Sequence, residues 1–291
     1  MQLIDRLDPL RSAVAALRRD GPVALVPTMG ALHEGHLTLV REAKRHAAHV
    51  VVSIFVNPRQ FGADEDLDAY PRELARDCAL LEAEDTALVW APTVDVMYPA
   101  GYATTISVSG VSEGLCGGSR PGHFDGVATV VCKLFNQVRP DIAFFGEKDW
   151  QQLAVIRRMA RDLDLSRPAV DAIVGVPTVR EPDGLAMSSR NAYLSAEERA
   201  RAATLPRAMR QAIAAIEGGA PVGPTLAALE QALVEGGFSH VDYVDMRDAR
   251  SLGPLDCPGG EPARLLVAAR IGGTRLIDNM PVAPATASPE D

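Results

Sequence analysis

No stretch of this sequence is suited to a membrane. No apolar run in its 291 residues approaches the roughly 20 residues that a membrane-spanning helix needs. The first eight residues, Met-Gln-Leu-Ile-Asp-Arg-Leu-Asp, lack the basic stretch and apolar core of a secretory signal peptide. These absences predict a soluble, cytoplasmic protein with no membrane partner.

Cysteine and net positive charge are also in short supply. The four cysteines, at 78, 116, 132 and 257, form no C-x-x-C pair, which favours a reducing compartment over a disulfide framework. The formal net charge is −9, so most of the surface would repel nucleic acid. We therefore expect no nucleic-acid partner, and an anionic substrate would need a local basic pocket.

What the sequence does contain is a glycine-bearing loop between a strand and a helix. Residues 23–26 form a short apolar run that predicts a buried strand, and Pro27 is expected to end it because proline has no N–H for a central ladder. Apolar residues then recur at helical spacing, so a helix should begin near Gly35 or His36. The N–H groups and positive dipole of a helix N-terminus attract phosphate.

Two histidines in this loop, His33 and His36, can each donate a hydrogen bond to a phosphate oxygen. Their spacing of three places both on one side of the first helical turn. The loop is neither a Walker motif, which requires Lys and Ser or Thr where His36 and Leu37 stand, nor a G-x-G-x-x-G fingerprint. Metal binding and a purely structural role stay open as alternatives, but the zincin pattern is excluded because its histidines are four apart.

Strands and helices alternate through residues 1–178. Apolar runs predict strands at 23–26, 50–56, 87–90, 142–145 and 170–176, and an extended piece at 104–108. Helices are predicted from Pro9, with Asp8 as N-cap, to about Gly21, around 74–81, and at 126–138 and 150–163. This alternation predicts a Rossmann-like α/β domain with a doubly wound parallel sheet.

The pattern changes to that of a smaller α+β domain over residues 179–291. Ser195-Ala-Glu-Glu is typical of a capping box, and it should open a long helix to about residue 216. A helix at 226–234 and a strand at 241–246 follow, and strands at 264–269 and 274–278 should pair as a hairpin about Gly272-Gly273. Residues from about 282 onward, rich in Pro, Ala and Ser, are expected to form a disordered tail.

Polar segments follow the strands where an open parallel sheet binds its ligands, outside the carboxyl ends. They are residues 28–36, 57–61, 146–149 and 179–190. We expect all four to lie on one rim of the sheet.

Several side chains in these segments suit a triphosphate or a hydroxylated carboxylate. Ser188, Ser189 and Arg190 combine two hydroxyls with a guanidinium fork, a donor set for phosphate oxygens. Lys148 can compensate triphosphate charge, whereas the neighbouring Asp149 could equally be an N-cap. The amides of Gln60 and Gln152 can donate to a carboxylate without repelling it and can accept from hydroxyls. Each of these residues alone would suit an ordinary surface position.

Other polar residues are candidates for substrate or metal contacts. Asn57 precedes Gln60 in the same loop, and Arg120 and His123 lie in a glycine-rich loop where they could meet phosphate or carboxylate or simply be solvated. Asp77 is a candidate Mg²⁺ ligand, and its alternative role is an exposed helical charge.

Six segments spread over nearly the whole chain form a recognisable set. They are Pro-Thr-Met-Gly-Ala-Leu-His-Glu-Gly-His at 27–36, Phe-Val-Asn-Pro-x-Gln-Phe at 55–61, Glu-Asp-Leu-Asp-x-Tyr-Pro-Arg at 65–72, Arg-Pro-x-His-Phe at 120–124, Gly-Glu-Lys-Asp at 146–149 and Ser-Ser-Arg-Asn at 188–191. The set resembles the pantothenate synthetase family, the pantoate and β-alanine ligases of the nucleotidyltransferase superfamily. Trp150 departs from the family pattern, in which Tyr is usual.

The resemblance implies an enzyme that condenses pantoate with β-alanine at the expense of ATP, through a pantoyl adenylate, with release of AMP and pyrophosphate. It implies Mg²⁺ with the ATP, and a homodimer. ATP contacts are implied for Met29, Gly30, Ala31, Leu32, His33, Glu34, Gly35, His36, Gly146, Glu147, Lys148, Asp149, Val179, Met187, Ser188, Ser189 and Arg190. Gln60 and Gln152 would hold pantoate, and Gln60 would also lie near β-alanine.

The predicted catalytic group consists of side chains that stabilise charge on the phosphoryl oxygens and the departing pyrophosphate. Its members are His33, His36, Lys148, Ser188, Ser189 and Arg190. His36 corresponds to the family's proposed proton donor, but we expect it to act mainly as a hydrogen-bond donor to phosphate. Two rival functions share the histidine loop: a cytidylyltransferase of the same superfamily, and a nucleotide-binding module without catalysis.

Overall fold

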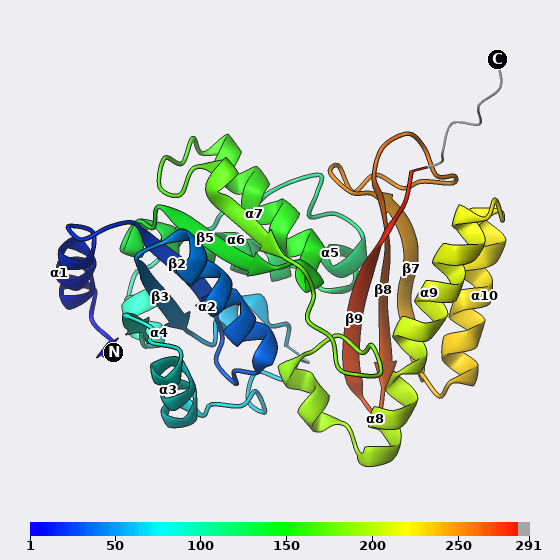
Figure 1. The fold of residues 1–291 in the computed structure, drawn as a ribbon, viewed down its shortest axis with the longest axis horizontal. Coiled ribbons are helices and arrows are strands. Elements are labelled where there is room, and N and C mark those ends of the chain that lie inside the picture. The colour runs from blue at the N-terminus through cyan, green and yellow to red at the C-terminus, as the bar shows by residue number, and fades with distance from the viewer. Residues whose placement is uncertain (64, 285–291) are drawn as a thin grey trace. The chain divides into compact units, whose positions relative to one another are not determined.

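The computed structural model describes residues 1–63 and 65–284, and it forms two compact units (Figure 1). The large unit comprises residues 1–112, 120–147 and 152–179, and the small unit comprises residues 113–119, 148–151 and the chain from 180 onward. Two short segments from before residue 152 therefore belong to the small unit. Residues 285–291, the greater part of the expected tail, lie outside the described residues.

A six-stranded sheet forms the centre of the large unit, and all its strand pairs are parallel. In spatial order its strands are β1 (Gln2–Ile4), β4 (Leu88–Trp90), β3 (His49–Ile54), β2 (Val23–Thr28), β5 (Ile142–Gly146) and β6 (Ile173–Val176). The flanking helices are α1 (Leu7–Leu17), α2 (Glu34–His46), α3 (Leu74–Ala83), α4 (Val94–Met97), α6 (His123–Val138) and α7 (Trp150–Asp162), of which α7 begins in the small unit. The predicted α/β class is confirmed, although β1 was not foreseen.

The central strands are nearly continuous apolar runs because both faces of the sheet are covered. The four residues 23–26 of β2 have no exposed surface, and neither do Val51 and Val52 of β3. Ala24, Val26 and Val52 share one core cluster with Leu37 and Val40 of α2. Each of the buried valines and leucines contributes about 1.5–3 kcal/mol to the free energy of unfolding, so β2 and β3 hold the loop that follows β2 on a rigid base.

The prediction that Pro27 ends its strand is wrong, because β2 continues to Thr28 and Pro27 pairs with Ser53 of β3. The carbonyl of Thr28 accepts from the Phe55 N–H at 3.1 Å, so the backbone groups of Thr28 face β3 and those of Pro27 face the other side. On that side, β2 pairs with β5 only at residues 24 and 25. The N–H that proline lacks would therefore have had no partner in the ladder.

The single long helix predicted from residue 195 to 216 is in fact two helices, α8 (Ala196–Ala202) and α9 (Thr204–Glu217). Pro206 explains the break, because a proline ring clashes with the carbonyl four residues earlier, here that of Ala202. The predicted capping box is confirmed. The Ser195 N–H donates to Glu198 Oε2 at 2.8 Å, and the Glu198 N–H donates to Ser195 Oγ at 3.3 Å.

Two further expectations need correction. Helix α1 begins at Leu7 with Arg6 as its N-cap, so Asp8 and Pro9 lie inside the first turn, where a missing N–H costs no intrahelical bond. Residues 104–108 form no strand. The Ile106 N–H instead donates to the hydroxyl of Thr129 on α6 at 2.9 Å, so a side chain takes the place of a neighbouring strand.

The small unit contains an antiparallel sheet of β7 (His240–Asp248), β8 (Ala263–Ile271) and β9 (Thr274–Val282), in that order. Helices α9 and α10 (Val222–Glu235) share one core cluster with this sheet. Strands β8 and β9 form the predicted hairpin. Gly272 and Gly273 have φ values of 54° and 77°, and a two-residue type I′ turn requires such positive values at both central positions. Helix α5 (Leu115–Ser119) also belongs to this unit.

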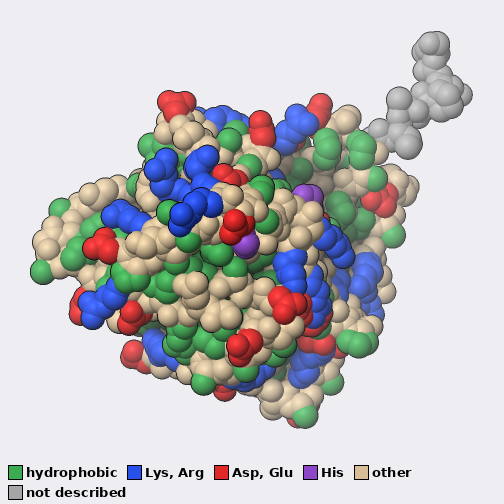
Figure 2. Space-filling model, turned by 60° about the vertical axis from the view of Figure 1, so that its left-hand side comes forward, with side chains coloured by type: hydrophobic (Ala, Val, Ile, Leu, Met, Phe, Trp, Pro, Cys, Tyr) green, Lys and Arg blue, Asp and Glu red, His purple; other side chains and the backbone are tan. Residues whose placement is uncertain are grey.

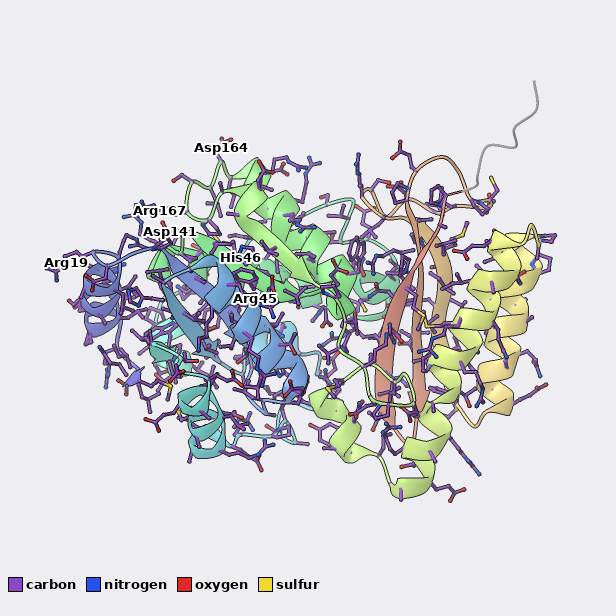
Figure 3. All side chains as sticks on the ribbon, in the orientation of Figure 1. Arg19, Arg45, His46, Asp141, Asp164 and Arg167 are labelled. Atoms are coloured by element: carbon purple, nitrogen blue, oxygen red, sulfur yellow. The ribbon has the colours of Figure 1, made fainter. Side chains whose placement is uncertain are left out.

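Charged side chains of both signs are interspersed on the face shown in Figure 2. One charged group lies at the end of the large sheet where β2 and β5 begin, and Figure 3 labels Asp141 and Arg167 there. Asp141 accepts from the Val23 N–H at 2.9 Å and pairs with Arg18 and Arg167 at 3.6 and 3.7 Å. We interpret this group as structural. Among the described residues, no helix has the length and apolar character needed to span a bilayer.

Candidate active site

The loop after β2 follows a path that only a few residue types allow. Gly30 has a φ of 83°, and a Cβ there would lie 2.9 Å from Asp77 Oδ2 and 3.2 Å from the Ile54 side chain. Thr28 Oγ1 donates to the Ser53 carbonyl at 2.7 Å and accepts from the Gly30 N–H at 3.3 Å. The glycine therefore lets the loop pass close over Asp77.

Asp77 is the residue that holds this loop in place. It comes from α3, has no exposed surface, and accepts from the Ala31 N–H at 2.9 Å through Oδ2 and from the Leu32 N–H at 2.8 Å through Oδ1. A carboxylate so engaged and so buried does not fit the expected Mg²⁺ ligand. Over residues 1–63 and 65–284, no group of three or more His, Cys, Asp or Glu side chains is arranged to hold a metal ion.

The two loop histidines form a reciprocal capping box at the start of α2. His33 is the N-cap, and its Nδ1 accepts from the Gly35 N–H at 3.2 Å. The His33 N–H in turn donates to His36 Nδ1 at 3.3 Å, and the two ring centroids are 4.1 Å apart. Because each Nδ1 is an acceptor, the neutral form of each ring carries its proton on Nε2. The histidines are thus two oriented Nε2–H donors.

Gln60 lies against the same loop through a chain of hydrogen bonds. Its Nε2 donates to Met29 Sδ at 3.0 Å, and its Oε1 accepts from Asn57 Nδ2 at 3.1 Å. Asn57 is 1% exposed, also donates to the Gly126 carbonyl at 3.1 Å, and accepts from the Tyr98 hydroxyl at 2.8 Å. In the structure, the buried Asn57 orients the Gln60 amide, and its own amide is engaged by the protein instead of being presented to a ligand.

Arg120 and His123 both contact the backbone of Gln60. The Gln60 carbonyl accepts from His123 Nδ1 at 2.8 Å and from Arg120 Nη2 at 3.2 Å. The Arg120 guanidinium also makes a bidentate pair with Glu65 at 2.6 and 2.5 Å. Burial raises the pKa of Glu65, but the hydrogen bonds and charge of Arg120 outweigh it and hold that pKa below its ordinary value. A carboxylate of the protein itself therefore occupies the guanidinium that was expected to meet a substrate anion.

Lys148 belongs to the small unit, as does Asp149. Lys148 Nζ lies 3.4 Å from Asp149 Oδ2, and its side chain is 20% exposed. The Lys148 carbonyl accepts from Asn279 Nδ2 on β9 at 2.8 Å. The ammonium is therefore carried on a backbone that the small sheet holds.

The Ser-Ser-Arg segment also lies in the small unit, at the start of a short 3₁₀ turn over Ser189–Tyr193. Ser188 is the N-cap of this turn and accepts from the Arg190 N–H at 3.3 Å. The preceding loop is held by Arg180, which makes a bidentate pair with the buried Asp278 at 2.6 and 2.8 Å. The turn is therefore attached to the hairpin strand β9.

The structure brings the predicted residues together in two groups, one in each unit. The large unit groups His33 and His36, and it joins Met29, Gln60 and Asn57 through the contacts above. The small unit holds Lys148 and Asp149 on one segment and Met187, Ser188, Ser189 and Arg190 on another. Gln152 on α7 and Val179 belong to the large unit. That all these segments share one rim stays a prediction.

A comparison with known protein families supplies the assignment that geometry alone cannot. The sequence matches the family model of pantoate-beta-alanine ligase over residues 2–281. The chain belongs to the pantoate-beta-alanine ligase family. The pantothenate synthetase of Novosphingobium aromaticivorans is 72% identical over 285 residues, which cover 98% of this chain and 100% of that protein. The chain is accordingly an enzyme of the ligase class.

Solved structures of pantoate-beta-alanine ligases have the same fold. The pantothenate synthetase of Thermus thermophilus matches with a TM-score of 0.90 at 48% identity, covering 98% of this chain and 100% of that one. A pantoate-beta-alanine ligase of Francisella tularensis, described as complexed with beta-gamma ATP and β-alanine, matches with a TM-score of 0.82 at 32% identity. It covers 96% of this chain and 97% of that one.

Sequence reasoning missed the supporting roles of Glu65 and Tyr98, and it singled out Asp77 for a different role, that of a Mg²⁺ ligand. Glu65 and Tyr98 have polar partners far along the chain, which no local pattern indicates. Asp77 did carry a signal. It lies four residues before the buried Leu81, on the inward face of α3, and a carboxylate at such a position must find N–H partners.

Proposed function

We propose that this chain activates pantoate with ATP as a pantoyl adenylate and transfers the acyl group to β-alanine, with release of AMP and pyrophosphate. The proposal rests on family membership, and the structural observation that carries it is the reciprocal capping box of His33 and His36. Two imidazoles with their protons on Nε2, at the positive end of a helix, suit a polyphosphate better than they suit a metal ion. Metal coordination needs an unprotonated nitrogen, and both Nδ1 atoms already accept from backbone N–H groups.

The first step forms a bond between a pantoate carboxylate oxygen and the α-phosphorus of ATP, and it breaks the bond from that phosphorus to the departing pyrophosphate. Negative charge grows on the phosphoryl oxygens and on pyrophosphate. We assign the stabilisation of this charge to the Nε2–H groups of the two histidines, to Lys148 and to the Ser188–Arg190 turn. A preorganised donor of this kind contributes about 100- to 1,000-fold to a rate.

In the second step the β-alanine amine attacks the acyl carbon and loses a proton, and AMP leaves with the oxygen that joined it to pantoate. Gln60 is the residue that we assign to pantoate. Its Oε1 is held by Asn57, and its Nε2 is turned toward Met29 of the histidine loop. The amide orientation is thus set before a ligand binds, which lowers the entropic cost of binding. The family resemblance extends pantoate contacts to Gln152.

Magnesium enters this proposal only as part of the substrate Mg·ATP. The buried carboxylate of Asp77 is engaged with the loop backbone, so we assign no resident metal to it. The resemblance also leads us to propose a homodimer in the cytoplasm. Sedimentation at micromolar protein concentration would test the dimer, and a monomer there would contradict it.

The proposed function is tested by ATP–pyrophosphate exchange with and without pantoate, followed by measurement of AMP release on addition of β-alanine. We expect exchange only with pantoate, and AMP release only with both substrates. A cytidylyltransferase would turn over with CTP and would not need β-alanine, and a non-catalytic module would bind ATP without exchange. Either result would reject the proposal.

The residue assignments are tested by His36→Ala and Lys148→Ala, each of which should lower pyrophosphate exchange about 100-fold or more. His46→Ala is the matched control for the histidine, since His46 lies at the far end of the same helix (Figure 3). Its side chain pairs with Glu42. Wild-type exchange rates in His36→Ala and Lys148→Ala would remove these residues from the mechanism.

A further inference from the structure

The segment 148–151 is attached to one particular place on the small sheet. Asn279 of β9 is 3% exposed, and its Nδ2 donates to the Lys148 carbonyl at 2.8 Å. Its Oδ1 accepts from Arg264 Nη1 of β8. A guanidinium has only donors, so the contact with Arg264 requires the amide oxygen on that side and turns the amide nitrogen toward Lys148.

Arg264 also fixes the segment through Trp150. Its guanidinium carbon lies 3.5 Å from the centroid of the Trp150 ring, and the indole N–H donates to the Ala249 carbonyl at 3.0 Å. The stack and the indole hydrogen bond hold the ring from its face and from its edge. One guanidinium therefore contacts both the residue that binds the Lys148 carbonyl and the side chain two positions after Lys148.

Gln151 attaches the segment on a second side. It is 4% exposed, its Oε1 accepts from the Cys116 N–H at 3.0 Å, and its Nε2 donates to the Glu113 carbonyl at 3.2 Å. These partners belong to the other short segment of the small unit, residues 113–119. The backbone on which Lys148 stands is thus held at its carbonyl, at an aromatic ring and at a buried amide.

We propose that Asn279 and Arg264 are positioning residues for the Lys148 ammonium, acting through the Lys148 carbonyl and the Trp150 ring. This inference rests on the proposed function, because it assumes that Lys148 stabilises phosphoryl charge. Neither residue needs to touch substrate. The strands β8 and β9 determine the position of the Lys148 ammonium. A substitution of Arg264 or Asn279 should therefore lower the rate of the reaction as well as the free energy of unfolding.

The decisive variant is Asn279→Asp. A carboxylate still accepts from Arg264, but it places an acceptor oxygen against the Lys148 carbonyl in place of the donating amide. Misplacement of a reacting group by about 1 Å can cost on the order of 100-fold, so we expect pantoate-dependent exchange to fall by about 10- to 100-fold. The fall should appear in kcat, with the KM for pantoate unchanged. Asn136→Asp, at an exposed site on α6, is the matched control for the added charge.

A double-mutant comparison separates positioning from stability. In a Lys148→Ala background, Asn279→Asp should lower exchange by less than about twofold, because the group it positions is already gone. The inference would be overturned if the fold-losses in exchange rate of the two single variants multiplied in the double variant. A wild-type kcat in Asn279→Asp would overturn it as well. If Asn279→Asp does not fold, Arg264→Lys replaces it, since an ammonium cannot stack on the ring and donate to Asn279 at once. The same coupling to Lys148 is expected there, and its absence would equally overturn the inference.

The two proposals fail in different ways. Absence of pantoate-dependent exchange in the wild-type protein would reject the proposed function. Normal exchange in the wild type together with uncoupled Asn279 and Lys148 variants would reject only the positioning role.

Discussion

Replacing Asp77 should loosen the histidine loop and lower the stability of the large unit at the same time. Asp77→Ala removes the acceptors of two backbone N–H groups, those of Ala31 and Leu32, at a site with no exposed side-chain surface. A hydrogen bond to a charged group contributes about 1.5–3 kcal/mol, so the two together contribute about 3–6 kcal/mol. We expect the lower end, because the loop can relax until its N–H groups meet water.

The expected loss can be read in a melting curve. For a protein of this size each 1 kcal/mol corresponds to about 2–4 °C, so a loss of about 3 kcal/mol lowers Tm by about 6–12 °C. Asp77→Asn should lose roughly half of that free energy, because the amide keeps one acceptor and turns its NH₂ toward the other N–H. Pyrophosphate exchange should fall in both variants, since His33 follows directly after the two N–H groups.

Glu82→Ala is the matched control, because Glu82 is an exposed acid on the same helix. It should change Tm by no more than a surface substitution does, about 0.5 kcal/mol in free energy. The reasoning would be refuted if Asp77→Ala had the same Tm as Glu82→Ala and kept full exchange activity. A lowered Tm with normal exchange would leave Asp77 as a structural residue only.

Three further predictions concern the packing and charges that support the site. Gly126→Ala places a Cβ 2.2 Å from the carbonyl oxygen of residue 59, so it should lower the free energy of unfolding in urea by about 1–3 kcal/mol. Gly223→Ala on α10, where a Cβ would meet open space, should raise it by about 0.5–1 kcal/mol, and equal effects would contradict this account. Arg180→Ala leaves the buried carboxylate of Asp278 without its guanidinium, so it should lower the free energy of unfolding by about 3–5 kcal/mol. Arg199→Ala removes a more exposed ion pair and should lower it by less than about 1 kcal/mol. The pKa of Glu65 is lowered in the folded protein, so its stabilising contribution is complete above its ordinary value of 4.5 and is lost as pH falls through the lowered pKa. When the free energy of unfolding is measured against pH, Glu65→Gln should lack this loss of stability in acid. A pH profile equal to that of the wild type would contradict the pairing of Glu65 with Arg120.

Local patterns in the sequence were sufficient for most of the fold. Buried parallel strands are continuous apolar runs, so β2 to β6 could all be predicted, although residues 170–172 form a 3₁₀ turn and only 173–176 belong to β6. Strand β1 lies at the edge of the sheet and is mostly exposed, so it has no buried apolar run that could predict it. The continuation of β2 through Pro27 could not be predicted, because it depends on where pairing with β5 stops. The break between α8 and α9 could have been predicted from the sequence, because the ring of Pro206 clashes with the carbonyl of residue 202.

The sequence supplied the candidate ligand-contacting residues, and their contact with a ligand stays a prediction, but it did not supply the residues that support them. The histidine motif is a local pattern, and so is the Ser-Ser-Arg turn. The partners that hold the histidine loop and Lys148 come from far along the chain: Asp77 lies 46 residues from Ala31, and Asn279 lies 131 residues from Lys148. Such pairs are determined by tertiary packing. For the same reason the sequence suggested that Arg120 would meet a substrate anion, when Glu65 is its partner.

The central claim is that a carboxylate is activated on the α-phosphorus of ATP, and isotope transfer tests it most directly. Pantoate labelled with ¹⁸O in its carboxylate should be turned over with ATP and β-alanine, and the nucleotide product analysed by mass spectrometry. The account predicts that AMP carries one labelled oxygen from each pantoate consumed. Unlabelled AMP, or ADP with the label in inorganic phosphate, would contradict it.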